Sequence, residues 1–201
     1  MEYYIAGCGG HAKVVYQIAL ENNIKIKSFL NIPLKNKSNL PKTILGIPII
    51  NYRYAKIKST VFIGLGNNND RIKTFKLLRK NKFKLPSLIS KSSYVHNSVK
   101  IGFGSIIFPN VTINIDAEIK NNSIINSGSI IEHEVKINNN VNVAPGSIIC
   151  GKTLINENCY IGAGSIIQQN LTIGKNCTIG SGSNVIDNIQ SNSIAFGNPA
   201  K

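Results

Sequence analysis

The sequence predicts a parallel β-helix preceded by a small α/β domain, and three observations lead to this fold class. From Ile89 to Gln190 the chain repeats every six residues, and each repeat opens on a β-branched residue. The fourth residue of most repeats is Gly or Asn, as a tight corner requires. The residues up to about Pro86 instead show strands that alternate with helices. We therefore expect two domains, residues 1–85 and 86–201.

The first position of the hexad is Ile or Val in all seventeen repeats, from Ile89 through Ile101 and Ile131 to Val185. An α-helix cannot keep residues six apart on one face, because 3.6 residues per turn does not divide six. A short strand followed by a corner can, and stacked units of this kind build a parallel β-helix. Three hexads make one triangular coil, so residues eighteen apart stack at about 4.8 Å, the spacing of neighbouring strands.

The fourth position of the hexad supplies the corners. From the third hexad onwards twelve of fifteen are Gly or Asn, the residues that enter the left-handed region most easily. The exceptions are Asp116, Glu134 and Lys152, which are eighteen residues apart and therefore stack as one column. His133 lies beside this column, and Gly151 lies one coil above His133. This corner lacks the favoured Gly or Asn in three successive coils and lies next to a histidine, which indicates a functional site.

The first 85 residues follow the order of a βαβ unit, which predicts a small Rossmann-like parallel sheet. An apolar-periodic helix follows the first strand and ends near Asn22, and a second helix runs to Lys80 with Asp70 as its N-cap. The segment 31–48 is rich in Lys, Asn and Pro and is expected to be a loop. The strands are expected at Tyr3–Ala6, Ile24–Leu30 and Thr60–Leu65.

A glycine-rich turn, GCGGH at residues 7–11, joins the first strand to the first helix. It fits the start of a dinucleotide-binding fingerprint. However, Ala12 replaces the third glycine, and Asn31 stands where an acidic residue would hold the ribose of NAD. Three interpretations stay open: a structural turn, a site for NAD, or a loop whose backbone N–H groups and His11 hold the phosphates or sugar of another nucleotide.

Composition narrows the class of protein. A hydrophobic content of 42% is typical of a globular protein. No apolar run approaches the length of a membrane span, and the start lacks the features of a signal peptide, so we expect a cytoplasmic protein without a membrane span. The four cysteines do not suggest a disulfide framework. Cys159 and Cys177 are eighteen apart at fifth positions and are expected to stack as small core side chains.

The formal net charge of +14 raises the question of nucleic-acid binding. The lysines are spread over the chain, without a basic block or interleaved aromatic residues, so we do not expect a nucleic-acid partner. A general positive field would also attract anionic small molecules such as coenzyme A or a nucleoside diphosphate.

Several motifs resemble those of the hexapeptide-repeat nucleotide-sugar N-acetyltransferases: GCGGH at 7–11, GLGNN at 64–68, NSGSIIEHE at 126–134 and the closing GNPAK at 197–201. These enzymes acetylate the 4-amino group of UDP-, dTDP- or GDP-linked amino sugars for bacterial glycans such as O-antigen. Sialic-acid O-acetyltransferases are similar in the same regions. The resemblance covers essentially the whole chain. It implies a left-handed β-helix, acetyl-CoA as co-substrate, no metal, and a homotrimer with each active site between two β-helices.

Carried onto this sequence, the resemblance assigns His133 as the general base and Glu134 as its support. The chemistry agrees independently, because an amine must be neutral to attack and the pKa of histidine suits proton removal near neutral pH. The backbone N–H of Gly151 would face the thioester oxygen as the tetrahedral intermediate forms. No Ser or Cys is paired with a base at a suitable spacing, so we expect direct attack on acetyl-CoA in a ternary complex.

The resemblance also assigns two sets of binding residues. Asn142 replaces a histidine that is common at its position, and Asn31 with Ile32 replaces an acidic pair common in the UDP-sugar enzymes, which leaves the nucleotide open. Positions that match the acetyl-CoA site are Asn142, Ala163 and Ser181. Positions that match the nucleotide-sugar pocket are Gly9, Gly10, His11, Asn31 and Gly66.

Outward-facing isoleucines predict a contact surface. Sixth positions of the hexad point away from the core, yet Ile106 and Ile124 form one stacked pair. Ile130, Ile148 and Ile166 form a second column. Exposed stripes of this kind are unfavourable on a monomer. Either neighbouring subunits of the implied trimer cover them, or the N-terminal domain or a loop does.

Three alternative functions differ in chemistry. A sugar O-acetyltransferase of the sialic-acid type would use the same His–Glu pair. A β-helix metalloenzyme such as a γ-class carbonic anhydrase needs three converging histidines, and only His96 and His133 lie in the repeat, so we exclude it. A non-catalytic scaffold would bind a nucleotide sugar without transferring an acetyl group.

Overall fold

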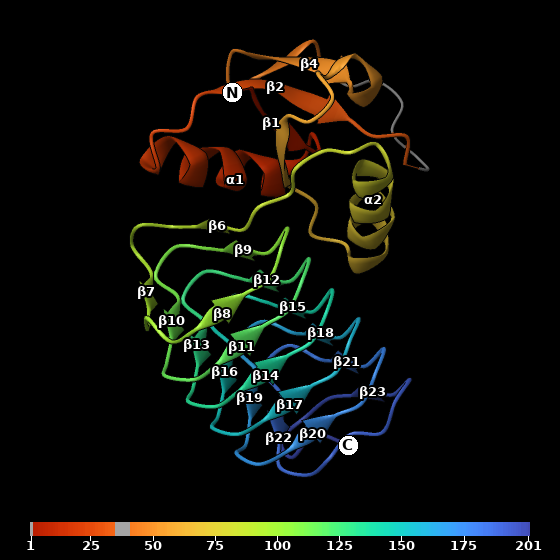
Figure 1. The fold of residues 1–201 in the computed structure, drawn as a ribbon. Helices are drawn as coiled ribbons and strands as arrows, with labels where there is room; N and C mark the ends of the chain where they lie inside the picture. Colours follow the sequence, from red (N-terminus) through yellow and green to blue (C-terminus); the bar gives the residue numbers. More distant parts are fainter. Residues whose placement is uncertain (1, 35–40) are drawn as a thin grey trace.

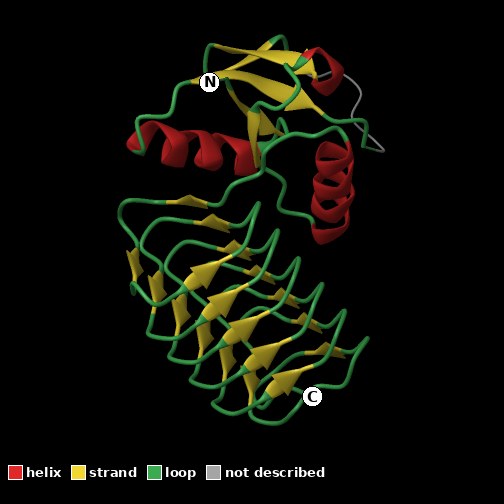
Figure 2. Cartoon of the chain, in the orientation of Figure 1, coloured by secondary structure: helices red, strands yellow, loops and turns green. Residues whose placement is uncertain are grey.

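The computed structural model describes residues 2–34 and 41–201 and contains the predicted fold class, an α/β region followed by a left-handed parallel β-helix (Figures 1 and 2). The α/β region covers one end of the β-helix, and the C-terminus lies toward the other end. None of the helices in the described part of the chain is both long and apolar enough to cross a lipid bilayer.

The N-terminal sheet has the strand order β3-β4-β2-β1-β5, and every neighbouring pair except β3 and β4 is parallel. Helix α1 (Gly10–Glu21) follows β1, and helix α2 (Asn68–Lys80) follows β5. The strands are β1 (Tyr3–Ala6), β2 (Ile26–Asn31), β3 (Thr43–Ile44), β4 (Ile47–Asn51) and β5 (Thr60–Ile63), with the 3-10 helix η1 (Tyr52–Tyr54) after β4. The predicted βαβ logic is confirmed.

Two local predictions in this region are wrong. The loop predicted at 31–48 is wrong over residues 43–48, which belong to a hairpin of β3 and β4: Leu45 and Gly46 both adopt positive φ (49° and 75°), as a two-residue hairpin turn requires. Residues 35–40 of the expected loop lie outside the described part. The N-cap of α2 is Asn67, whose side-chain oxygen accepts from the backbone N–H of Asp70 at 3.0 Å, so Asp70 lies inside the first turn.

The β-helix consists of two-residue strands that stack into three parallel sheets. Their orders are β6-β9-β12-β15-β18-β21-β23, β7-β10-β13-β16-β19-β22 and β8-β11-β14-β17-β20. The strands are β6 (Leu88–Ile89), β7 (Tyr94–Val95), β8 (Lys100–Ile101), β9 (Ile106–Ile107), β10 (Thr112–Ile113), β11 (Glu118–Ile119), β12 (Ile124–Ile125), β13 (Ile130–Ile131), β14 (Lys136–Ile137), β15 (Asn142–Val143), β16 (Ile148–Ile149), β17 (Leu154–Ile155), β18 (Tyr160–Ile161), β19 (Ile166–Ile167), β20 (Thr172–Ile173), β21 (Thr178–Ile179), β22 (Asn184–Val185) and β23 (Ile194–Ala195).

The register of these sheets is the predicted eighteen residues; Val143, for example, pairs with Ile125 below it and Ile161 above it. Fourth-position residues from Gly104 to Gly182 all adopt positive φ, between 56° and 70°, which confirms the corners. The last hexad is irregular, because Ile173 pairs with Ile189, sixteen residues later, and Asn188 does not adopt the left-handed conformation. The period therefore ends one hexad earlier than expected.

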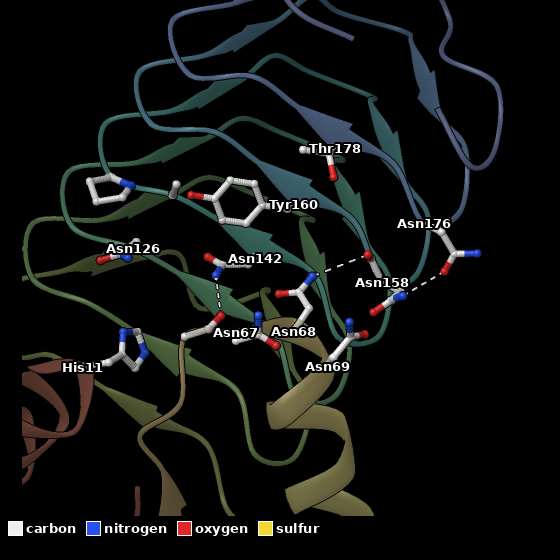
Figure 3. Close-up of a pocket in the computed structure, with 13 residues that line it drawn as sticks. His11, Asn67, Asn68, Asn69, Asn126, Asn142, Asn158, Tyr160, Asn176 and Thr178 are labelled. Atoms are coloured by element: carbon white, nitrogen blue, oxygen red, sulfur yellow. Dashed lines mark hydrogen bonds between the residues drawn. The ribbon is translucent and has the colours of Figure 1, made fainter. Parts of the chain in front are cut away.

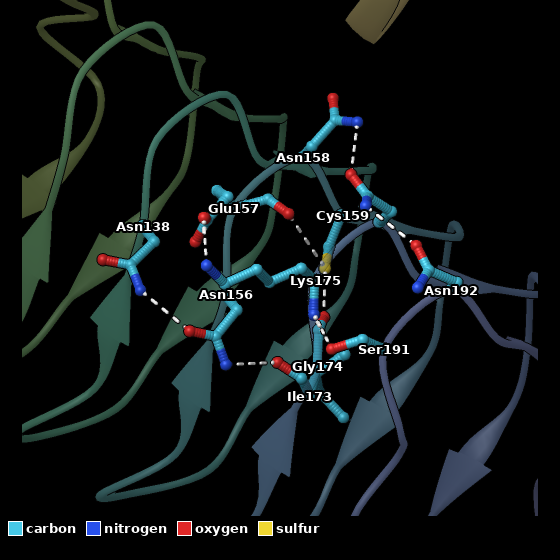
Figure 4. Close-up of polar contacts among 11 residues, drawn as sticks. Asn138, Asn156, Glu157, Asn158, Cys159, Ile173, Gly174, Lys175, Ser191 and Asn192 are labelled. Atoms are coloured by element: carbon cyan, nitrogen blue, oxygen red, sulfur yellow. Dashed lines mark hydrogen bonds and ion pairs between the residues drawn. The ribbon is translucent and has the colours of Figure 1, made fainter.

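Polar and thiol side chains form ladders along the coils (Figure 4). Asn158 donates to Asn176 at 2.8 Å, and Asn176 donates to Asn192 at 2.9 Å. Cys159 and Cys177 are buried as predicted, and burial raises the pKa of the Cys159 thiol to about 12. The Cys159 thiol donates to the carbonyl of Gly174. Both thiols are thus buried and serve as small core side chains.

The two predicted isoleucine stripes have different environments. Ile106 and Ile124 are fully buried in one core with Ala12 and Val15 of α1, so the N-terminal region covers them and a subunit contact there is not needed. The second stripe stays at the surface: Ile130 and Ile148 are half-buried, and Ile166 is 37% exposed.

The chain passes from the first region to the second between Lys84, whose carbonyl accepts from Val61, and Leu88, which pairs with Ile106. We propose that the boundary between domains 1–85 and 86–201 lies here.

The positive charge is less evenly spread along the chain than expected. Residues 1–85 hold 16 of the 23 Lys and Arg but only three of the nine Asp and Glu, so nearly all of the net charge belongs to the N-terminal region.

Candidate active site

The corner after β13 carries the predicted histidine and its carboxylate neighbour. His133 Nδ1 lies 3.2 Å from Glu134 Oε1, and the two side chains are 49% and 51% exposed. If Glu134 accepts the proton on Nδ1, then Nε2 keeps its lone pair and can take a proton from another molecule. The same carboxylate oxygen lies 3.8 Å from Lys152 Nζ. The arrangement is a half-exposed imidazole that is oriented by a carboxylate.

Gly151 lies directly against the ring of His133. A Cβ atom built on Gly151 would be 2.5 Å from His133 Nε2 and 2.6 Å from Cε1, so any other residue here would displace the ring. The coils are tied at this point because the backbone N–H of Lys152 donates to the carbonyl of His133 at 3.0 Å. Nε2 therefore faces a bare stretch of backbone, the geometry that the spacing of eighteen predicted.

The residues beside His133 adopt an unfavourable backbone conformation. Glu134 and Lys152 have φ of 59° and 60°, although the other corners use Gly or Asn almost throughout. A left-handed conformation at a residue with a long side chain costs roughly 1–2 kcal/mol. Such departures gather at functional sites, where a particular side chain is worth more than local stability.

A polar cavity lies away from this corner, between the N-terminal region and the outer face of the sheet that contains β12, β15, β18 and β21 (Figure 3). Its volume is about 500 Å³. It lies beside the carboxyl ends of β1 and β5, where the chain connections diverge and where open α/β sheets bind ligands. Its lining residues are His11, Gly66, Asn67, Asn68, Asn69, Asn126, Asn142, Ala144, Pro145, Asn158, Tyr160, Asn176 and Thr178.

Two polar atoms in this lining have no hydrogen-bond partner among the described residues: Nε2 of His11 and Oδ1 of Asn142. The other end of the Asn142 carboxamide donates to the carbonyl of Gly66 at 3.0 Å. Burial, and secondarily the charge of Arg71, lowers the pKa of His11 to about 4. His11 is therefore neutral at pH 7, and its ring is held 4.8 Å from that of Phe108.

The structure groups the predicted site residues differently from the expectation. His11 and Gly66 line the cavity, and they are joined by Asn142, which was assigned with the acetyl-CoA positions. Ala163 and Ser181, eighteen residues apart, lie instead at the corners that follow β18 and β21. Gly9 and Gly10 are exposed at the start of α1, Asn31 ends β2, and none of the three lines the cavity. His133 is also absent from the lining, because it follows a strand of another sheet.

Sequence reasoning missed part of the cavity wall. Tyr160 and Thr178 stack above Asn142 at intervals of eighteen, and Asn158 and Asn176 stack likewise, so the period could have identified them as one surface. Arg71, which is fully buried behind the loop at Gly66, was also missed.

Comparisons with known proteins agree with this architecture. Residues 3–78 match the PglD N-terminal domain family, and residues 152–187 match the bacterial transferase hexapeptide family (six repeats). Among solved structures, the acetyltransferase domain of PglB from Neisseria gonorrhoeae FA1090 is 26% identical, with a TM-score of 0.91 and coverage of 100% of this chain and 98% of that chain.

Two further solved structures are similar over the whole chain. PerB from Caulobacter crescentus, in complex with CoA and GDP-perosamine, is 27% identical, with a TM-score of 0.91 and coverage of 100% and 96% of the two chains. WeeI from Acinetobacter baumannii AYE is 26% identical, with a TM-score of 0.89 and coverage of 100% and 99%.

The hexapeptide β-helix and these matches define the class of the protein, which is an acetyltransferase of the hexapeptide-repeat type. Its PglD-type N-terminal domain is fused to this β-helix in the same way as in PglB and PerB. The chain is thus similar over its whole length to solved sugar acetyltransferases, in agreement with the resemblance of its sequence motifs.

Proposed function

We propose that the protein transfers an acetyl group from acetyl-CoA to the amino group of a nucleotide-linked 4-amino-4,6-dideoxy sugar, with His133 as the general base. The observation that carries this proposal is the position of His133 Nε2 against the backbone of Gly151, with Glu134 on the other ring nitrogen. The likeness to PerB, which was solved with CoA and GDP-perosamine, supports the choice of both substrates.

The chemistry follows from this geometry. The neutral amine attacks the thioester carbonyl carbon, so a C–N bond forms and the carbonyl oxygen becomes an oxyanion. In this proposal the Gly151 N–H stabilises that oxyanion, and His133 Nε2 accepts the proton that the nitrogen loses. Collapse breaks the C–S bond, and the protonated imidazole returns the proton to the leaving CoA sulfur. Glu134 stabilises the imidazolium between these two steps.

We assign the 500 Å³ cavity to the nucleotide sugar. Its lining is rich in carboxamides, with hydroxyl groups from Tyr160 and Thr178, and two buried polar atoms, on His11 and Asn142, lack partners among the described residues. Such atoms suit a ligand with several hydroxyl, amide and phosphate groups. Gly9, Gly10 and Asn31 would extend this site along the rim of the sheet. The corner at Ala163 and Ser181 is our proposed acetyl-CoA surface, where small residues expose backbone groups.

We also propose that the active unit is a homotrimer in the cytoplasm. Within one chain, the cavity and His133 belong to different sheets of the β-helix, so one copy does not place the nucleotide sugar beside its own base. The surface stripe Ile130, Ile148 and Ile166 runs along β13, β16 and β19, the sheet that leads into the His133 corner. Packing of this stripe against a neighbouring copy would bring one copy's cavity to another copy's histidine.

The test is thiol release from acetyl-CoA with a panel of UDP-, dTDP- and GDP-linked 4-amino sugars. We expect His133→Ala to lower kcat by about 10²–10⁴-fold, the usual contribution of a general base, with little change in calorimetric binding of the nucleotide sugar. His96→Ala is the matched control, because His96 also lies in the β-helix but contacts Ser98 at 3.0 Å.

Three results would contradict the proposal. Full activity in His133→Ala would remove the base assignment. A wild-type preference for sugar hydroxyls over amines would favour an O-acetyltransferase. Binding of nucleotide sugars without any acetyl transfer would leave a non-catalytic scaffold.

A further inference from the structure

Arg71 is the largest fully buried side chain of the protein, and it has no carboxylate partner among the described residues. It lies in the first turns of α2, and its guanidinium donates only to neutral oxygens. Burial lowers its pKa to about 9, which still leaves it charged at neutral pH. The acceptors are the carbonyls of Asn122 (2.9 Å), Gly66 (2.9 Å), Asn140 (3.2 Å) and Val141 (3.4 Å) and the side-chain oxygen of Asn68 (3.0 Å).

These contacts join the start of α2 to three successive coils. Asn122, Asn140 and Asn158 stack at one corner of the β-helix, where each donates its side-chain N–H to the next asparagine along the column. Arg71 donates to the backbone carbonyls of Asn122 and Asn140. Asn68, one turn earlier on the same face, donates to the carbonyls of Asn158 (3.4 Å) and Cys159 (3.0 Å). In return Asn140 donates to the carbonyl of Asn68 at 3.1 Å.

The same guanidinium holds a wall of the cavity. Its Nη1 donates to the carbonyl of Gly66, which also accepts from Asn142. Residues 66–69, together with His11, line the cavity from the N-terminal region, across from Tyr160 (Figure 3). His11 packs beneath this loop, because a Cβ on Gly66 would lie 3.6 Å from its Nδ1. Arg71 thus fixes the distance between the loop and the β-helix coils.

A requirement for stability alone does not explain this residue. A buried charge without a counter-charge is unfavourable, and replacement of buried ionic groups by well-packed apolar residues is often neutral or stabilising. What an apolar side chain cannot do is hold several carbonyl groups from two regions at fixed angles, which the planar guanidinium does. The contacts therefore point to precise placement of the loop.

We propose that Arg71 is a positioning residue for the acceptor pocket, acting through the Gly66 carbonyl to set loop 66–69 and His11 against the Asn142 surface. The identity of the ligand as a nucleotide sugar rests on the proposed function. The placement of the loop does not.

The kinetic test uses Arg71→Met, which keeps bulk but removes all donors, and Arg71→Lys, which keeps the charge and one donor group. We expect the KM for the nucleotide amino sugar to rise by at least about tenfold in Arg71→Met and by less in Arg71→Lys. The KM for acetyl-CoA should stay within about twofold, because Ala163 and Ser181 lie away from this contact. Arg79→Met is the matched control, since Arg79 is exposed on the same helix and lies 6.0 Å from the Phe103 ring centroid.

A second measurement needs no substrate. Hydrogen exchange of the backbone amides of residues 66–69 should become faster in Arg71→Met and stay unchanged in Arg79→Met. If Arg71→Met does not fold, Arg71→Lys gives the same comparison. Unchanged exchange, or equal increases in the KM values of both substrates, would overturn the positioning role. If the wild type transfers no acetyl group, the proposed function is overturned. The hydrogen-exchange measurement then decides the role of Arg71 by itself.

Discussion

At the scale of single residues, His11 shows how the docking of two regions changes the chemistry of a side chain. The sequence places it on a glycine-rich turn, where an exposed imidazole would titrate near 6.5. The β-helix instead buries the ring against Phe108, within the field of Arg71, and lowers its pKa to about 4. His11 is therefore a neutral donor or acceptor in the cavity over the whole physiological range of pH.

This burial makes stability depend on pH in a defined window. Between pH 6.5 and about 4 the unfolded chain binds a proton at His11 that the native chain does not bind. The free energy of unfolding therefore falls as the pH falls through this window, by up to roughly 3 kcal/mol from this group. Urea unfolding of the wild type and His11→Gln at pH 7 and 4.5 checks this. The variant should lose less stability on acidification, whereas parallel losses would show that His11 is not buried in solution.

Residue spacing revealed one half of the site and not the other. His133 and Gly151 could be placed together because the period of eighteen fixes which residues stack within the β-helix. The cavity could not be found in this way. It forms where the loop at Gly66 meets the face of Asn142, and nothing in the period says which face the N-terminal region covers.

At the scale of elements, the corners after β10, β13 and β16 carry the column Asp116, Glu134 and Lys152. This column is locally less stable than a column of Gly or Asn would be. Glu134 and Lys152 hold the left-handed conformation without the advantage of Gly or Asn. The ion pair between them is about half exposed at 3.8 Å, and contacts of this kind contribute about 0–1 kcal/mol. The strain is therefore not offset within the column, and a functional role is the remaining explanation for Glu134.

Replacement of each residue by Asn separates stability from function. We expect Lys152→Asn to raise the free energy of unfolding by about 0.5–1 kcal/mol, because Asn adopts positive φ more easily, with little change in kcat. Glu134→Asn should give a similar gain in stability but lower kcat about tenfold or more, because His133 Nδ1 loses its acceptor. Urea unfolding and initial rates measure the two effects. Equal activity in both variants would show that Glu134 is only a corner residue.

The elements themselves were predictable to different degrees. Strands of the β-helix follow from a β-branched residue at every sixth position, since no other regular structure keeps that spacing in register. The hairpin at Leu45 did not follow, because a Leu with φ of 49° gives no sequence signal for a turn. The N-cap of α2 was misplaced by three residues, since Asn67 and Asp70 are equally good caps by type and only the backbone decides between them.

At the scale of the whole molecule, the surface stripe of Ile130, Ile148 and Ile166 bears on the assembly. Ile148→Asp would place a carboxylate in the middle of the proposed subunit contact, where burying an unpaired charge is strongly unfavourable. Analytical ultracentrifugation should show a trimer for the wild type and monomers for the variant, together with loss of acetyl transfer. Thr172→Asp, at the exposed outward position of β20 in another sheet of the β-helix, is the control. A variant that stays trimeric would place the contact on another face.

The uneven charge of the molecule leads to a final prediction about rates. Nearly all of the net positive charge lies in residues 1–85, next to a cavity that we assign to an anionic nucleotide sugar. A field of this kind raises association rates of anionic ligands, and salt screens it over about 10 Å at 0.1 M. We therefore expect kcat/KM for the nucleotide sugar to fall several-fold between about 25 and 250 mM KCl. The uncharged acetyl donor acetyl-pantetheine is the control, because its kcat/KM at saturating nucleotide sugar should barely change. If both fall equally, the salt acts on the protein fold or assembly and the N-terminal charge does not guide the substrate.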